Sequence, residues 1–182
     1  MHIPKCKLVS IDIVSLYTNM DITKVLEAMN TFIPERDDII GAIKFILKNN
    51  YFTFQDTVYK QINGMAMGTN MAVMVANIYV HVVLDSQIAT QMPGSNRQIF
   101  LYRRYIDDIL IFWNGSDVEL EYFMTRVHRI ADPLKFTIAS SDSELPFLDL
   151  ELYWSEHNLL ETRIYQKPMN RYMYIPYTSN HP

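Results

Sequence analysis

The hydrophobic positions of this chain recur at two periods, one typical of strands and one typical of helices. Short apolar or alternating runs, typical of buried strands, occupy residues 6–13, 98–105, 109–113 and 134–139. Apolar residues at helical spacing occupy 21–32, 34–49 and 116–130. A fourth stretch, 70–91, is apolar on almost every side and predicts a central buried helix.

Polar and glycine-containing segments separate these elements. Thr18-Asn19-Met20-Asp21 predicts a turn that ends in Asp21 as a helix N-cap, and Pro34 is expected to open the next helix. Ser116 begins a capping box for the helix that follows it. Hairpins are expected at residues 51–62 and 147–165, and loops at 64–69 and 92–96.

The order of the elements is strand, helices, strand, turn, strand, helix and strand. This order predicts an α+β fold with the split β-α-β pattern of a ferredoxin-like sheet. A segment of about residues 18–63 is then inserted between the first strand and the first long helix. A chain of 182 residues fits one domain, with room for a small attached lobe, and no internal repeat is visible.

Composition excludes some classes of protein. With 49% hydrophobic and 13% aromatic residues, the chain has ample material for a core and is unlike a disordered protein. Its net charge of −4 argues mildly against a simple nucleic-acid binder, although bound cations would reverse the local sign of an acidic site. The single cysteine, Cys6, excludes an internal disulfide and a cysteine-based zinc site.

The sequence gives no sign of a membrane protein. Residues 1–5 form no apolar targeting segment. The longest apolar stretch, 71–84, is shorter than the roughly 20 residues that a membrane span needs, and Asn77 and His81 interrupt it. We therefore expect a soluble intracellular protein with no membrane partner.

Three acids mark the candidate chemistry. Asp107 and Asp108 lie between two predicted strands, so a tight turn would hold both at the tip of a hairpin, and Asp12 ends the first predicted strand. Adjacent carboxylates repel each other unless a divalent cation neutralises them. Three converging carboxylates would suit two-metal phosphoryl or nucleotidyl transfer. An acid pair in a turn is, taken alone, more typical of a solvated turn.

The combination of features is more specific than the acid pair. Asp12 ends a strand, Tyr17 follows five residues later, Gly68 precedes the buried helix, and Tyr105-Ile106-Asp107-Asp108 lies in a hairpin. With this order and spacing, the chain resembles the palm of a reverse transcriptase, and more narrowly the Penelope-like group of retroelements. The stretches that carry the resemblance are 10–19, 64–69, 76–77, 104–108, 135–137, 147–150, 164–168 and 179–182. Where the family has Ala-Pro after the glycine loop, this chain has Ala72-Val73.

The resemblance implies a metal site. Asp12 and Asp107 would bind two Mg²⁺ or Mn²⁺ ions, Asp108 would be the third acid, and the backbone carbonyl of Ile13 would complete the coordination. Oxygen ligands suit these ions and disfavour zinc. The alternative for Asp12 is a strand-end cap or a salt bridge.

The resemblance also implies contacts with the incoming deoxynucleoside triphosphate. Tyr17 would stand under its sugar and clash with a 2′-hydroxyl, although Tyr17 is equally typical of a core position. Met67 and Gly68 would lie in the loop against the nascent base pair, with a plain turn glycine as the alternative for Gly68. Lys135 would lie near the leaving phosphate, but a solvated strand-end lysine is the simpler interpretation.

An RNA template and a DNA primer are the implied macromolecular partners. Tyr105 would lie beside them, and Arg103 and Arg104 would either contact their phosphates or neutralise nearby acids. Phe147 and Leu148 would lie at the primer, or would belong to an ordinary core hairpin.

The predicted function is therefore RNA-directed DNA polymerisation. Residues 1–166 would form the palm with part of the fingers, and 167–182 would begin the connection to a thumb that the chain lacks. The main alternative is a non-catalytic remnant of a retroelement, acting as a nucleic-acid or protein interaction module. A cyclase built on the same sheet is a second alternative. A eukaryotic retroelement would place the protein in the nucleus.

Overall fold

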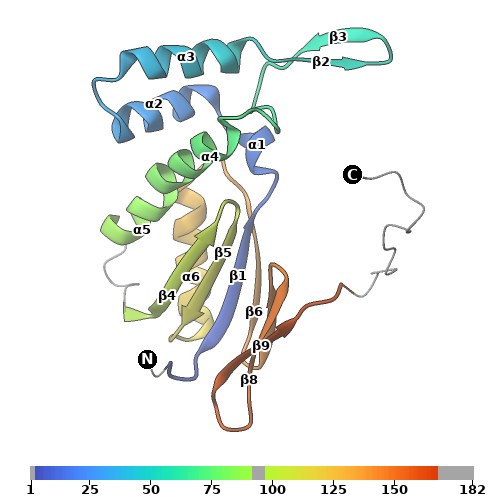
Figure 1. Ribbon diagram of the computed structural model, residues 1–182. Helices are drawn as coiled ribbons and strands as arrows, with labels where there is room; N and C mark the ends of the chain where they lie inside the picture. The colour runs from blue at the N-terminus through green and yellow to red at the C-terminus, as the bar shows by residue number, and fades with distance from the viewer. Residues whose placement is uncertain (1–2, 92–96, 168–182) are drawn as a thin grey trace, which may run out of the picture.

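The protein is built on a four-stranded antiparallel sheet with helices packed on one face (Figure 1). The computed structural model describes residues 3–91 and 97–167. The predicted loop at 92–96 and the segment 168–182, which contains most of the predicted connection to a thumb, lie outside the described residues. The strands of the main sheet are β1 (Lys7–Ile13), β4 (Ile99–Tyr105), β5 (Asp108–Trp113) and β6 (Phe136–Ser141).

The topology of this sheet confirms the predicted ferredoxin-like pattern. The strand order is β4-β5-β1-β6, and each neighbouring pair is antiparallel. The connection from β1 to β4 contains α4 (Ala72–Val80), η1 (His81–Asp85) and α5 (Ser86–Gln91), and α6 (Asp117–Ile130) connects β5 to β6. The first and third strands of the repeat therefore lie side by side at the centre, which is the split β-α-β arrangement.

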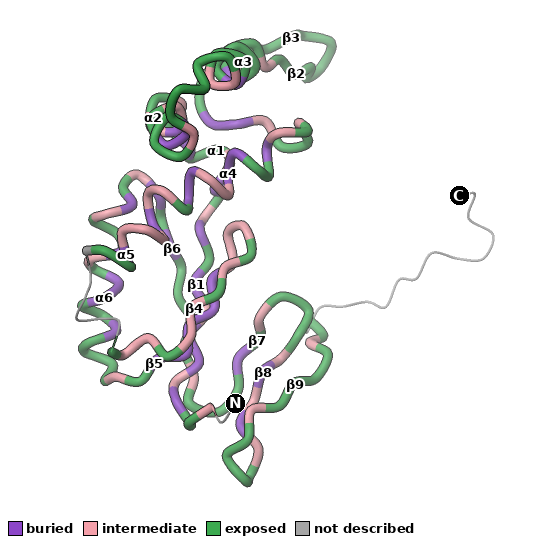
Figure 2. The backbone as a smooth tube through the Cα atoms, turned by 60° about the vertical axis from the view of Figure 1, so that its left-hand side comes forward, coloured by how far each residue is buried: buried purple, intermediate pink, exposed green. Residues whose placement is uncertain are grey.

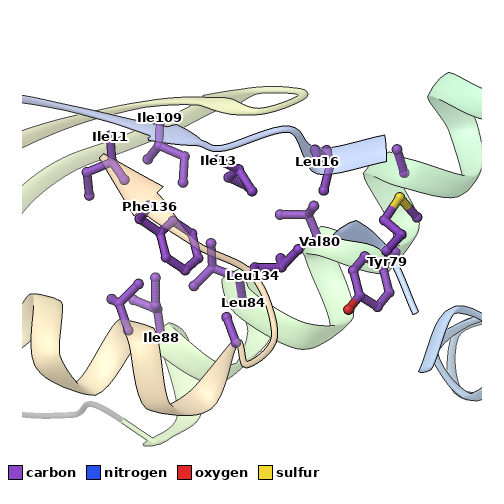
Figure 3. Close-up of a cluster of buried hydrophobic side chains, with 14 of the residues drawn as sticks. Ile11, Ile13, Leu16, Tyr79, Val80, Leu84, Ile88, Ile109, Leu134 and Phe136 are labelled. Carbon is purple, nitrogen blue, oxygen red and sulfur yellow. The ribbon is translucent and has the colours of Figure 1, made fainter. Parts of the chain in front are cut away.

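The main core lies between the sheet and its helices. Alternate residues of β1 point to this face, so Val9, Ile11 and Ile13 are all buried there. Figure 3 shows part of this core, with Ile11 and Ile13 of β1 and Val80 and Leu84 from the long helical connection. One face of β1 is thus fully committed to packing.

The other face of the sheet has two parts with different character. At one end, Leu8, Leu110 and Phe112 are buried beneath a second sheet, against Leu152 and Trp154. That sheet consists of β7 (Glu144–Phe147), β8 (Leu150–Trp154) and β9 (Leu160–Ile164). At the other end these strands do not cover the face, and Figure 2 shows the tip of the β4–β5 hairpin in the colours of intermediate and exposed residues.

The inserted segment forms a layer beyond one end of the sheet (Figure 1). It contains α1 (Leu16–Asn19), α2 (Ile22–Phe32), α3 (Asp37–Lys48), β2 (Tyr51–Phe54) and β3 (Thr57–Lys60). Asp21 caps α2 as predicted, since its carboxylate accepts from the Lys24 backbone N–H at 2.9 Å. Pro34 does not open α3, which begins three residues later. Glu35 lies between them with φ 66°, a left-handed conformation that a right-handed helix cannot contain.

The long helix differs from its prediction in two ways. It is not buried all round, since the side chains of Val73 and Met74 are 49% and 65% exposed. It also contains a π-helical turn, η1, in its middle. Within the described residues, one helix, Ala72–Thr90, is long and apolar enough to cross a membrane by length and composition, which corrects the shorter span inferred from the sequence. A core helix passes the same test, and the inner face of this helix packs in the main core.

Other boundaries also shift. The hairpin expected at 147–165 is formed by β8 and β9, and a further strand, β7, precedes it and is joined to β8 by a tight turn at Leu148 and Asp149. β7 was missed because Pro146 has no N–H for a strand ladder, and β7 tolerates this residue because it lies at the edge of its sheet. β6 begins two residues later than expected, because Leu134 is held in a turn by Ala131.

Candidate active site

The register of the main sheet places two of the three acids directly opposite each other. Asp12 pairs with Asp108 across β1 and β5, so both side chains lie on the same face of the sheet. Tyr105 pairs with Asp108 on one side, and Thr137 pairs with Asp12 on the other. The result is one row of polar residues across four strands, on the face away from the helices. Like charges directly opposite in a sheet are destabilising.

The third acid lies in the turn between β4 and β5. Only two residues, Ile106 and Asp107, connect Tyr105 to Asp108. The backbone carbonyl of Asp107 accepts from the Ile13 N–H at 3.0 Å, which ties the turn to the end of β1. Ile106 has φ 54°, a conformation that costs a β-branched residue about 1–3 kcal/mol and that concentrates at functional sites.

Charge and burial act on the carboxyl groups of Asp12 and Asp108. Burial, and then the charge of Asp107, raise the pKa of Asp12, while a hydrogen bond from Thr137 lowers it. Burial, and then the charges of Asp107 and Asp12, raise the pKa of Asp108. The three acids therefore interact electrostatically. A cation at this site would relieve their repulsion.

We expect the variant Asp108→Asn to be more thermostable than the wild-type protein at neutral pH in the absence of metal. A carboxyl group whose pKa is raised by folding costs nothing below its ordinary pKa of 3.8, and its cost is complete above the raised pKa. Removing one of two opposed charges should raise Tm by up to about 3 °C at about pH 7 and have no effect at about pH 3. Thermal unfolding followed by circular dichroism measures this shift. An unchanged or lower Tm at neutral pH would show that the acids do not repel.

The donor set fits Mg²⁺ or Mn²⁺. Asp12, Asp107 and Asp108 supply only oxygen ligands, which these ions prefer. Among the described residues, no three His, Cys, Asp or Glu side chains are grouped closely enough to enclose an ion. Mg²⁺ does not require such a cage, because it binds through one or two carboxylates together with water and substrate phosphates.

Tyr17 lies beside the acids. It is half-buried in α1, and burial and the charge of Asp107 raise the pKa of its hydroxyl. Its backbone is fixed from the glycine loop, since the Met65 N–H donates to the Tyr17 carbonyl at 2.7 Å. Gly64 packs against the same backbone, and a Cβ there would lie 2.6 Å from the Tyr17 carbonyl oxygen.

The rest of the glycine loop is open. Gly68 has φ 88°, which favours glycine, and nothing lies within 4 Å of where its Cβ would stand. Met67 is 72% exposed. Val73, which replaces the family proline, lies half-exposed in the first turn of α4. The loop therefore leaves room for a ligand near Gly68.

Three predicted contact residues share the acidic face. Arg103 and Tyr105 are exposed, and by strand alternation they lie on the same face of β4. Lys135 is also exposed, and its carbonyl accepts from the Val14 N–H at 2.9 Å, which extends the pairing of β1 and β6 beyond Asp12. Lys135 therefore lies one step beyond Thr137 on this face.

Arg104 does not share this arrangement. Its side chain points to the helical face and is 9% exposed. It donates to Asp85, to Asn77 and to the Ile106 carbonyl, so that all five of its N–H groups are used. The prediction that Arg104 contacts a phosphate is therefore not supported, and its alternative role, neutralising a nearby acid, fits the geometry.

Phe147 and Leu148 lie in the second sheet. Leu148 is 45% exposed and has φ 54°, so the turn of Leu148 and Asp149 resembles that of Ile106 and Asp107. Phe147 packs at the margin of the buried cluster that lies between the main sheet and the second sheet. This arrangement is compatible with both interpretations of Phe147 and Leu148, as residues that contact the primer and as members of an ordinary core hairpin.

Sequence reasoning missed three residues that support the site. Gly64 was treated only as one end of a loop, although its contact with the Tyr17 backbone requires glycine. Asn77 and Asp85 were not assigned any role, although both bind Arg104. No local pattern marks these residues, because their partners are distant in sequence.

Comparisons with solved structures identify the fold. A telomerase from Candida albicans in complex with a TWJ fragment of telomeric RNA superposes with a TM-score of 0.65 at 12% identity, over 84% of this chain and 31% of that chain. The corresponding complex from Candida tropicalis gives 0.64 at 10% identity, over 95% and 32%. The BmCPV RNA-dependent RNA polymerase at elongation state gives 0.57 at 15% identity, over 90% and 17%. At these identities the likeness shows the fold alone, and this chain spans less than a third of each structure.

Comparison at the level of sequence identifies the family. No curated protein matches the chain. A family model described as reverse transcriptase (RNA-dependent DNA polymerase) matches residues 2–145, which include all three acids, Tyr17 and the glycine loop. This match covers well over half of the 182 residues, and the chain therefore belongs to the reverse transcriptase family.

Proposed function

We propose that this chain carries the palm of an RNA-directed DNA polymerase, which joins a deoxynucleoside triphosphate to a primer 3′-hydroxyl on an RNA template. The observation that carries the proposal is the direct pairing of Asp12 with Asp108, with Asp107 in the adjoining turn. Opposed acids are costly in a sheet, and their cost is offset when they bind cations. The Penelope-like motifs, the palm at 1–166 and the partial fingers at 18–63 are parts of the same proposal.

The charged residues of the acidic face each have a role in this proposal. Asp12, Asp107 and Asp108, with the Ile13 carbonyl, would hold two Mg²⁺ or Mn²⁺ ions. Bound ions supply activation of the attacking hydroxyl and stabilisation of the leaving pyrophosphate. Lys135 offers a positive charge to the phosphates from the end of β6, and Arg103 offers one to the template or primer backbone.

The exposed face and strained turn also suit primer binding. Tyr105 stands next to Asp108 in the polar row, where a primer terminus would have to lie for its 3′-hydroxyl to react. Phe147 and Leu148 present apolar surface on the second sheet, which covers the other end of the same face. Met67 and Gly68 border the position of the new base pair.

The proposal predicts that Tyr17→Ala will increase the use of ribonucleotides. The Tyr17 ring would exclude a 2′-hydroxyl, and removing a steric block of this kind changes discrimination by about 10-fold to 200-fold. The measurement is the ratio of kcat/KM for a ribonucleotide to that for the matching deoxynucleotide. Tyr122→Ala, an exposed tyrosine on α6, is the control. An unchanged ratio would place Tyr17 in a purely structural role.

The direct test combines metal binding with primer extension. Oligo(dT) annealed to poly(rA) supplies the template and primer, and extension is followed with Mg²⁺ and with Mn²⁺. Binding of Mn²⁺ to the chain is measured by electron paramagnetic resonance in the absence of nucleic acid. Incubation with nucleotide alone separates a cyclase, which needs no primer. A chain that neither binds Mn²⁺ nor extends the primer would contradict the proposal.

A second candidate function, a non-catalytic interaction module, is favoured by one surface. All eight residues of β2 and β3 are exposed, and Phe52 and Tyr59 stack on this hairpin with their ring centroids 5.5 Å apart. Exposed aromatic residues near Lys60 are typical of surfaces that stack single-stranded bases. Binding of single-stranded RNA without Mn²⁺ binding or primer extension would favour this alternative.

A further inference from the structure

The guanidinium of Arg104 connects the long helix to the turn that carries Asp107. Its Nε and Nη2 atoms bind the carboxylate of Asp85, with the shortest distance 2.8 Å. Its Nη1 donates to the Asn77 side chain at 2.9 Å and to the Ile106 carbonyl at 2.8 Å, and Nη2 also reaches the Asn77 carbonyl at 3.2 Å. Every donor is therefore committed within the protein.

The π-helical turn explains why Asn77 and Asp85 can share one partner. In a regular α-helix, residues eight apart differ by about 80° around the axis, because each residue turns by about 100°. A π turn accommodates one extra residue. The eight-residue interval then spans the rotation of about seven residues, and the two side chains come within about 20° of each other. Without this turn, Asp85 would lie about 80° around the helix axis from Asn77.

Asp85 is itself held in place from several sides. The Tyr102 hydroxyl donates to its Oδ1 at 2.7 Å, and its Oδ2 lies 3.5 Å from Nδ1 of His81. The side chains of Arg104 and Asp85 are only 9% and 19% exposed. A buried ion pair stabilises only when its remaining donors and acceptors are satisfied, as they are here for Arg104. Such an arrangement favours one geometry over others.

The hydrogen bonds of Arg104 extend from the long helix to the strained turn between β4 and β5. Ile106, whose carbonyl Arg104 binds, has φ 54°, and Asp107 follows it. The Asp107 carbonyl in turn accepts from the Ile13 N–H, one residue beyond Asp12. We propose that Asn77, Asp85 and Arg104 are positioning residues, which hold the Ile106–Asp107 turn against the end of β1 and thereby set the spacing of Asp107 and Asp12. The inference rests on the proposed function only where it calls these acids metal ligands.

The Ile13 amide provides a test that needs no activity. Its exchange with solvent, followed by NMR in the full chain, reports how firmly the turn is held to β1. Arg104→Lys keeps the charge but loses the planar fork, so it should speed exchange at Ile13 by at least about tenfold. The amide of Ile111, in the central strand β5, should exchange as in the wild-type protein. The matched control is Arg36→Lys, which removes an exposed two-bond contact with Asp38.

A second variant keeps the test decisive if the single change prevents folding. Asp85→Asn combined with Arg104→Gln removes both charges, so that neither is left buried without its partner. It should also speed exchange at Ile13 and weaken Mn²⁺ binding by about tenfold, an effect typical of losing the support of a metal ligand. Wild-type exchange at Ile13 in either folded variant, or equal acceleration at Ile111, would overturn the inference. A wild-type chain that binds no Mn²⁺ would contradict the proposed function but leave the exchange result standing.

Discussion

Changing Asp107 to Asn is expected to lower primer extension by at least about 1,000-fold, the effect of losing about 4 kcal/mol of transition-state stabilisation from a metal site. Asn has nearly the same shape as Asp, so the tight turn and the hydrogen bond from the Ile13 N–H to the residue 107 carbonyl should persist. The change removes the charge that acts on Asp12, Asp108 and Tyr17. Activity should therefore fall without loss of the fold.

The measurement is primer extension together with Mn²⁺ binding, for Asp107→Asn and for Asp12→Asn. Asp56→Asn is the matched control, because Asp56 is the second residue of another two-residue hairpin turn, far from the main sheet in sequence. Circular dichroism and Tm establish that each variant is folded. If Asp107→Asn and Asp12→Asn bind Mn²⁺ as the wild-type chain does, then the assignment of the acids to a metal site is wrong.

The second large effect is expected at Gly64, where Gly64→Ala should lower the free energy of unfolding by about 2–4 kcal/mol. An added Cβ would lie 2.6 Å from the Tyr17 carbonyl oxygen and 2.8 Å from the Thr18 Cα. These are backbone atoms, so no side-chain rotation relieves the contact. Gly64 also has φ 71°, which disfavours alanine. The backbone of Tyr17 should shift in any folded population.

Two other glycines separate the cost of the close Cβ contact from the cost of the positive φ. Gly68 has φ 88° but an open surrounding, so Gly68→Ala should cost only the conformational part, about 1–2 kcal/mol. Gly41 lies in α3 with nothing near its Cβ position, and Gly41→Ala should stabilise by about 0.5–1 kcal/mol. Urea unfolding measures all three values. Equal costs at Gly64 and Gly68 would mean that the close contact with Tyr17 has no energetic weight.

Much of the architecture could be predicted because its signals are local. The apolar run before Asp12, the capping box at Ser116 and the acid pair between two strands each depend on neighbouring residues. The boundaries that failed depend on other parts of the fold. β7 contains Pro146 and forms only as the edge of a separate sheet, and α3 begins late because of the backbone at Glu35.

The supporting residues of the site were harder to predict for the same reason. Arg104 could be given two roles from its charge, but only the orientation of β4 toward the helices shows that it is buried. The π turn has no sequence signal, and yet it decides which face of the helix carries Asp85. A contact between residues many positions apart is a property of packing, and it is not a property of either local sequence.

The sequence alone determined the order of the elements, the three acids and their family, because strand and helix periods and short motifs are encoded by adjacent residues. The tertiary structure alone decided that Asp12 stands opposite Asp108 and that Gly64 touches Tyr17. It also decided that Arg104 is buried and donates to the Ile106 carbonyl, one residue before Asp107. The physical reason is that strand register and side-chain burial are fixed only when distant segments pack together.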